Sequence, residues 1–175
     1  ADSLAAWAGS VLHHGTGQTD TVLMAAAWRA TDPDTLADLA DLALALAPSS
    51  ERRAETLEQG AAFARTTRAV WDLALPDMAL PVAVGRAARQ MGQPLPPTAR
   101  LYLQTILANL VQAAQRLLPV GQTEAQMVLA RLSARIPAHV EATLPLTPDD
   151  LGTFTPALDT AAMRHETREP RLFRS

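Results

Sequence analysis

Apolar residues recur every three to four positions along most of the chain, which is the spacing of amphipathic helices. The most regular stretch keeps this spacing through Leu103, Ile106, Leu107, Leu110, Val111, Ala114, Leu117 and Leu118. Polar residues such as Asn109 and Gln112 fall on another face of the same stretch. The pattern therefore predicts a long helix with one buried face, which Pro119 and Gly121 bring to an end.

Proline, glycine and small polar residues divide the rest of the chain into further helices. We expect these at residues 4–13, 21–30, 33–47, 51–75, 81–91, 123–136, 139–144 and 157–167. Asp32 and the pair Ser49–Ser50 are typical N-terminal caps, and Thr19 or Asp20 is expected to cap the second helix.

Two short segments are predicted to connect helices. Residues 15–17, Gly-Thr-Gly, are typical of a turn, and residues 94–97, Pro-Leu-Pro-Pro, of a rigid connector. The predicted fold is all-α: a single-domain helical bundle of about 7–9 helices over residues 1–175, with 170–175 as an extended C-terminal tail.

Composition supports helices, since 35 residues are alanine and aromatic residues make up only 4%. The chain holds no cysteine, which excludes disulfides, thiolate nucleophiles and cysteine-ligated metal centres. All 15 basic residues are arginine, so no lysine is present for a phosphate-binding loop or a Schiff base.

The net charge of −3 argues against nucleic acid as a partner. No apolar run reaches the roughly 20 residues of a membrane span, and no secretory leader is evident, so we expect a cytoplasmic protein.

The four histidines form no predicted metal site. His13 and His14 are adjacent, and neighbouring side chains diverge by about 100° around a helix axis, so we interpret them as a polar helix end. His139 is expected to be a solvated residue. His165–Glu166 begins the zinc-protease motif H-E-x-x-H, but position 169 is glutamate and the motif fails. The residues alone thus indicate a non-catalytic binding or scaffold protein; a helical small-ligand-binding regulator or a small helical enzyme is the alternative.

Two stretches, residues 107–129 and 151–175, carry specific motifs. The first contains Asn-Leu-Val at 109–111 and Pro-Val-Gly-Gln-Thr-Glu-Ala-Gln at 119–126. The second contains Met-Arg-His-Glu-Thr at 163–167 and Arg-Leu-Phe-Arg-Ser at 171–175. Weaker matches are at 4–7, 15–20, 81–85, Glu55 and Gly60. Together these motifs closely resemble the urease accessory protein UreF family, from near the start of the chain to its last residue.

The chain departs from the family pattern in two places. The family usually opens with Leu-Pro-x-Gly-x-Phe-Ser-x-Ser-x-Gly-Leu-Glu, which nothing here matches, so we expect the chain to be a member truncated at its N-terminus. Residues 167–170 read Thr-Arg-Glu-Pro where the commoner form has Gln and an aromatic residue. Because Pro170 fixes its own φ and biases Glu169 toward extended geometry, we expect the local conformation of the tail to differ.

The resemblance implies a role in nickel delivery. UreF-like proteins are all-helical, dimeric and not known as enzymes; they bridge UreD (also called UreH) and the GTPase UreG, and the assembly loads nickel into apo-urease. It follows that this chain is expected to bind no cofactor tightly. The assembled complex would handle nickel, and UreG, whose activity UreF is thought to tune, would bind GTP. The expected partners are UreD/UreH, UreG and, through the complex, apo-urease, with a second copy of the chain as a homodimer; no nucleic acid and no membrane are expected.

The same motifs supply the candidate partner-binding residues. In the C-terminal segment these are Arg164, His165, Glu166, Arg171, Leu172, Phe173, Arg174 and Ser175, and in the first motif they are Gly121, Gln122, Thr123 and Gln126. Arginine and phenylalanine are frequent in interface hot spots. Each segment also has an interpretation that needs no partner. Leu172 and Phe173 could pack back onto the domain, and Thr123 and Gln126 could form a capping box at a helix N-terminus.

Overall fold

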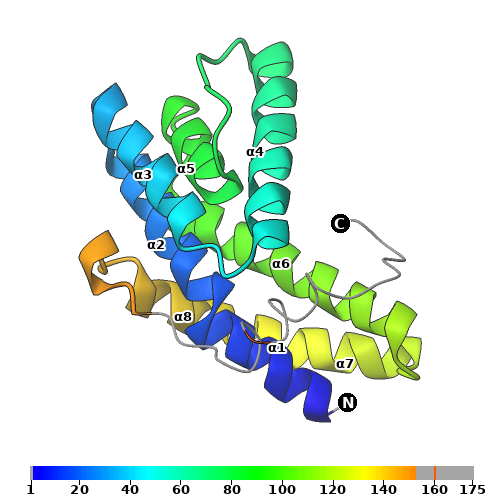
Figure 1. Cartoon of the computed structure of the whole chain (residues 1–175). Helices are drawn as coiled ribbons and strands as arrows, with labels where there is room; N and C mark the ends of the chain where they lie inside the picture. The colour runs from blue at the N-terminus through cyan, green and yellow to red at the C-terminus, as the bar shows by residue number, and fades with distance from the viewer. Residues whose placement is uncertain (1, 153–159, 161–175) are drawn as a thin grey trace. The chain divides into compact units, whose positions relative to one another are not determined.

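The described part of the chain is built from helices. The structure is a computed structural model that describes residues 2–152 and residue 160, and no strand occurs among them. In chain order the helices are α1 (Asp2–His14), α2 (Thr16–Arg29), α3 (Pro33–Ala45), α4 (Ser50–Trp71), α5 (Leu80–Gln90), α6 (Leu95–Leu117), α7 (Gln122–Ser133), α8 (Ile136–Thr143) and the 3-10 helix η1 (Pro148–Asp150) (Figure 1). The predicted all-α fold is confirmed. The helix expected at 157–167 lies, apart from residue 160, outside the described residues.

The chain divides into two compact units. Among the described residues, unit 1 comprises 2–22 and 94–152, and unit 2 comprises 23–93 and residue 160. The boundary falls within α2, whose first residues belong to unit 1. The assignment of one domain to the whole chain stays a prediction. In the part of the chain described, no helix is long and apolar enough to cross a bilayer.

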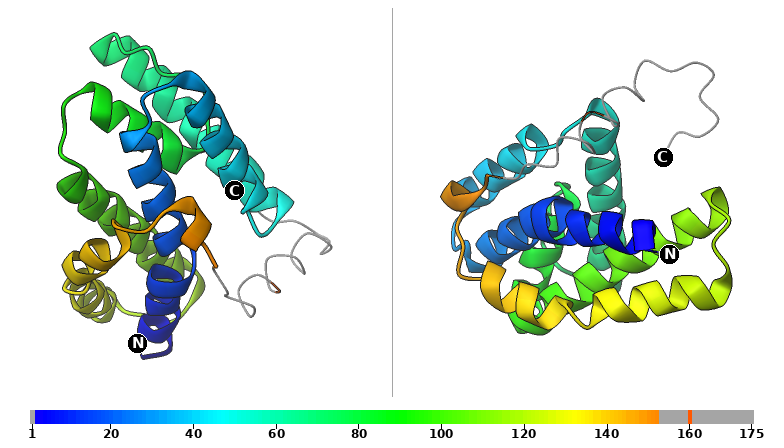
Figure 2. Two further views of the ribbon diagram at one scale, coloured as in Figure 1. Left: turned by 90° about the vertical axis from the view of Figure 1, so that its left-hand side faces the viewer. Right: turned by 90° about the horizontal axis from the view of Figure 1, so that it is seen from below.

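In unit 1, α6 packs against α1, α7 and α8, and α1 also packs against α7. Figure 2 shows α6 and α7 running back along one another as an antiparallel pair. The core is lined by Leu4, Ala8, Leu12, Leu103, Leu107, Val111, Ala125, Val128, Leu132 and Val140. Burying each leucine contributes about 1.5–3 kcal/mol, so the predicted apolar stripe of α6 is what anchors this unit.

In unit 2, α5 packs against α3 and α4 through small residues. Ala64, Leu75 and Ala87 form one buried cluster of this unit, with Phe63 and Leu73 packed against them. Two helical glycines allow the backbones to approach closely. A Cβ added to Gly60 in α4 would overlap the carbonyl oxygen of Met78, and one added to Gly85 in α5 would overlap that of Met24. Both glycines fall in stretches that carry the weaker family matches.

Local capping explains where α3 and α4 begin. Thr35 donates its backbone N–H to the Asp32 carboxylate over 2.7 Å, and Arg52 donates to the Ser49 hydroxyl over 3.1 Å. These caps confirm the predicted helix starts. However, α4 ends at Trp71 rather than near residue 75, because Asp72 adopts a left-handed conformation with φ 54°.

Two predicted connectors proved to be helical. Helix α2 begins at Thr16, directly after Gly15, so the expected turn is only a bend, and Thr19 and Asp20 lie inside α2 instead of capping it. The Thr19 hydroxyl donates back to the Gly15 carbonyl, which satisfies it within the helix. Likewise, residues 95–97 form the first turn of α6. Backbone N–H groups in the first turn have no partner within the helix, so proline, which lacks this group, is tolerated there.

Candidate functional site

The end of unit 1 where α6 meets α7 holds the first family motif. We call residues 117–127 the α6–α7 corner. Leu118 and Gly121 both have extended backbones, with φ −125° and −71°, and Val120 donates its N–H to the Leu118 carbonyl over 2.8 Å. The chain therefore reverses between two helices within four residues, Leu118 to Gly121.

The predicted capping box at this corner was wrong. Helix α7 begins at Gln122, and its N-cap is Gly121, which supplies no side-chain hydrogen bond. Thr123 consequently lies inside the first turn, two residues after the N-cap position. Gln122 instead accepts a hydrogen bond from the Gln115 amide over 2.7 Å, which ties α7 to α6. Capping thus does not explain the motif.

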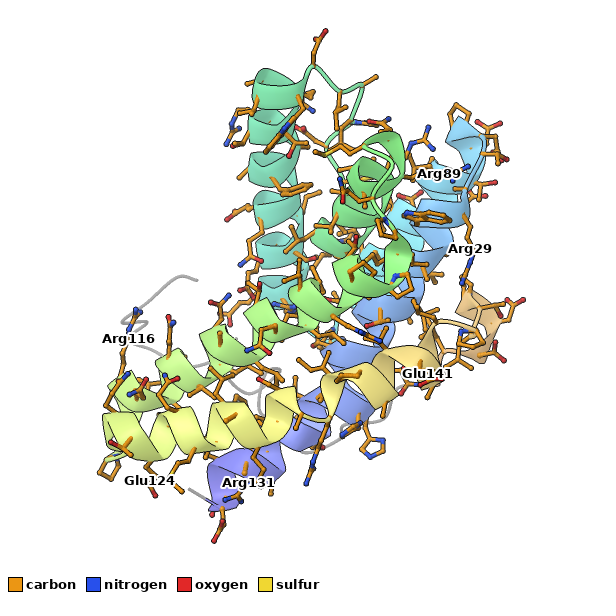
Figure 3. The ribbon with its side chains drawn as sticks, turned by 180° about the vertical axis from the view of Figure 1, so that it is seen from behind. Arg29, Arg89, Arg116, Glu124, Arg131 and Glu141 are labelled. Carbon is orange, nitrogen blue, oxygen red and sulfur yellow. The ribbon has the colours of Figure 1, made fainter. Side chains whose placement is uncertain are left out.

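The corner exposes both amide and apolar groups. Gly121, Gln122, Thr123 and Gln126 are all exposed. Leu117, Leu118 and Met127 are 76%, 51% and 61% exposed, although the first two belong to the apolar stripe predicted for α6. Figure 3 shows Arg116 and Glu124 at the same end of the two helices. Exposed large apolar side chains beside polar groups of both signs are typical of a protein-binding surface.

The other candidate residues lie outside the described part of the chain. These are Arg164, His165, Glu166, Arg171, Leu172, Phe173, Arg174 and Ser175. Their role in partner binding, and the alternative that Leu172 and Phe173 pack onto the domain, stay predictions.

A histidine pair was missed by sequence reasoning. His139 is only 8% exposed, so the prediction of a solvated residue was wrong. It occupies the buried face of α8 with Ile136, Val140 and Thr143, an i, i+3, i+4, i+7 spacing that marks the inward side of a helix. Its Nδ1 lies 3.3 Å from Nδ1 of His13 at the end of α1, and the two rings are nearly perpendicular.

Burial and neighbouring charges favour the neutral forms of both rings. Burial lowers the pKa of His13, and the charges of Arg135 and His14 lower it further. Burial also lowers the pKa of His139, and the charge of the facing His13 ring lowers it further. A hydrogen bond to the Gly17 backbone raises this pKa and offsets part of the shift. In their neutral forms, one ring can donate an Nδ1–H to the Nδ1 lone pair of the other. Within the described residues, no group of three or more His, Asp or Glu side chains is placed to hold a metal ion.

The described part of the chain is helical and exposes large apolar side chains at a family motif, an arrangement typical of proteins that act through a binding surface. The family model for UreF matches residues 1–133, which include the α6–α7 corner. A urease accessory protein UreF of Roseobacter denitrificans is 44% identical over 175 residues, covering all of this chain and 78% of that protein. One of Cereibacter sphaeroides is 48% identical over 171 residues, covering 97% of this chain and 79% of that protein. One of Bradyrhizobium diazoefficiens is 42% identical over 185 residues, covering 99% of this chain and 76% of that protein. The chain belongs to the UreF family.

Proposed function

We propose that this chain is a urease accessory protein that acts as a non-enzymatic scaffold. It bridges UreD/UreH and the GTPase UreG during GTP-dependent nickel insertion into apo-urease, and it modulates the GTPase activity of UreG. One observation carries the proposal: relatives named urease accessory protein UreF are 42–48% identical over almost the whole chain. The assembly works in the cytoplasm, with this chain as a homodimer.

The composition supports a division of labour among the partners. Without a lysine for a phosphate-binding loop, this chain leaves GTP to UreG. Without cysteine, this chain offers no thiolate ligand for a metal, and in the proposed assembly nickel is cargo of the whole complex. No tightly bound cofactor is required of this chain.

The α6–α7 corner is the partner surface that the described residues favour. Ala114, Ala125 and Val128 are buried on the inward faces of α6 and α7 at this end of the two helices. Their packing holds the two helices together beneath the exposed side chains of the corner. Association would remove Leu117, Leu118 and Met127 from water, and burial of such side chains is the main favourable term in association. The exposed side-chain amides of Gln122 and Gln126 would then form hydrogen bonds that orient the partner.

Co-purification with UreD and UreG tests the proposal. Leu117 and Leu101 form a matched pair, because both are leucines of α6 in unit 1 and are 76% and 70% exposed, but only Leu117 belongs to the corner. Leu117→Ser is expected to reduce recovery of the complex, and Leu101→Ser to leave it unchanged. The Roseobacter relative is the positive control. No complex with the unsubstituted chain, while the relative assembles, would refute the scaffold role; equal recovery of both variants would refute the corner as its surface.

A further inference from the structure

The His13–His139 pair brings two ring nitrogens from distant parts of the sequence face to face. Its two Nδ1 atoms, from residues 126 positions apart, face one another across 3.3 Å. This separation lies just beyond about 2.7–3.2 Å, the usual range for an N–H···O hydrogen bond, and it still allows one ring to donate to the other. Both atoms can carry an in-plane lone pair, and nitrogen lone pairs that converge from two helices are what a metal ion needs.

The separation matches two ligands of one tetrahedral ion. Metal–nitrogen bonds of about 2.0–2.1 Å at a tetrahedral angle place the two nitrogens about 3.3–3.4 Å apart. We propose that His13 and His139 bind one divalent ion of the zinc or nickel type through their Nδ1 atoms, with water in the remaining positions. The inference goes beyond the scaffold role, because it concerns this chain without partners.

The surroundings hold the His139 ring in the orientation that such a site needs. Its Nε2 lies 3.5 Å from the Thr143 hydroxyl on the next turn of α8. In the tautomer that the site requires, the proton is on Nε2, near the Thr143 hydroxyl, and the Nδ1 lone pair faces His13. Metal-bound imidazoles usually donate their second N–H to such a partner. His139 is buried while His13 is only half-buried, so His13 is the side from which an ion enters.

Charge and ligand number make the site weak and exchangeable. Only two imidazoles converge, and His14 is exposed with its ring centre 6.3 Å from that of His13, so it lies beside the pair and not within it. Arg135 is close enough to His13 to disfavour a second positive charge there. Replacing Arg135 with a neutral residue should therefore tighten binding, whereas loss of either imidazole should weaken it.

Titration of the whole chain with Zn²⁺, and separately with Ni²⁺, tests the proposal by calorimetry and by imidazole NMR signals. We expect Zn²⁺ to shift the ring signals of His13 and His139. We also expect His13→Gln to weaken binding by at least about tenfold. That factor is the lower end of the loss in metal affinity seen when a residue that only hydrogen-bonds a metal ligand is replaced. His14→Gln is the matched control, since the neighbouring imidazole is removed without touching the pair. Arg135→Gln should bind more tightly.

His165 could bind the same ions, so each titration is repeated with His165→Gln. If the His13 and His139 signals do not respond, or if His13→Gln and His14→Gln lose affinity equally, the site is refuted. Circular dichroism of His13→Gln shows whether a loss of binding comes from a loss of folding. His13 is substituted instead of His139 because it is only half-buried, so its replacement disturbs the core less. Recovery of the complex with UreD and UreG reports on the scaffold role alone, so the two proposals can fail separately.

Discussion

Gly60 and Gly9 offer a test of how helix propensity and close packing compete. Both lie in the interior of a helix, Gly60 in α4 and Gly9 in α1. Alanine is favoured over glycine in a helix interior by about 1 kcal/mol, so propensity alone predicts that both Gly→Ala variants are more stable. The surroundings of the two added Cβ atoms predict opposite outcomes.

At Gly60, the new Cβ would overlap the Met78 carbonyl oxygen and lie 2.7 Å from the Leu80 nitrogen and 2.9 Å from the Ala79 carbonyl carbon. These are backbone atoms of a buried segment, since Met78 and Ala79 are 4% and 0% exposed. Overpacking costs about 1–3 kcal/mol, and clashes with backbone belong at the upper end. After the gain in propensity, we expect Gly60→Ala to lose about 2 kcal/mol.

At Gly9, the new Cβ would lie 3.7 Å from Leu132 Cδ2 and 3.8 Å from an Arg135 guanidinium nitrogen, which are ordinary contacts. We expect Gly9→Ala to gain about 1 kcal/mol. For a chain of this size, about 2–4 °C accompanies each kcal/mol, so Tm should fall by about 4–8 °C for Gly60→Ala and rise by about 2–4 °C for Gly9→Ala. Thermal and urea unfolding followed by circular dichroism measure both. A Gly60→Ala variant as stable as the unsubstituted chain would refute the close approach of α4 to residues 78–80.

Three further predictions concern single contacts and the tail. Tyr102 donates its hydroxyl over 2.7 Å to the buried Asp20, so Tyr102→Phe should cost about 1.5–3 kcal/mol in urea unfolding; a neutral result would contradict the contact. The Thr35 backbone N–H lowers the pKa of Asp32 below its ordinary value of 3.8, so its carboxylate stabilises the fold above about pH 4, and this contribution is lost as the pH falls through the lowered pKa. The stability difference between the unsubstituted chain and Asp32→Asn should therefore shrink in urea titrations below about pH 4, and a difference independent of pH would exclude the ionised cap. Removal of residues 171–175 should weaken recovery of the complex with UreD and UreG while circular dichroism stays unchanged; a collapse of helicity would instead make the tail structural.

Helix starts set by neighbouring residues were predictable from the sequence. Asp32 and Ser49 each lie three residues before the N–H group that they accept from, so the cap and its partner are read from one short window. The start of α2 was not predictable in this way. Thr19 and Asp20 have the chemistry of caps, but Thr19 bonds back along α2 and Asp20 accepts from Tyr102, 82 positions away.

The histidine pair shows the same limit at the candidate metal site. Local reasoning correctly separates His13 from His14, because neighbours on a helix diverge. It could not bring His13 to His139, since that contact depends on how α1 and α8 pack in unit 1. One local signal was available: His139 shares its helical face with Ile136, Val140 and Thr143. A histidine on such a face is to be read as buried, and a buried imidazole needs a polar partner somewhere in the core.

Exposure then separates two kinds of functional evidence in this chain. Leu117 is 76% exposed, so its replacement by serine changes little of the folded core, and lost assembly in Leu117→Ser would indicate a surface directly. His139 is buried, so its replacement would alter packing together with any metal site, and only its half-buried partner His13 allows the two effects to be told apart. For this reason the α6–α7 corner is tested by assembly and the histidine pair by titration, each at its more exposed residue.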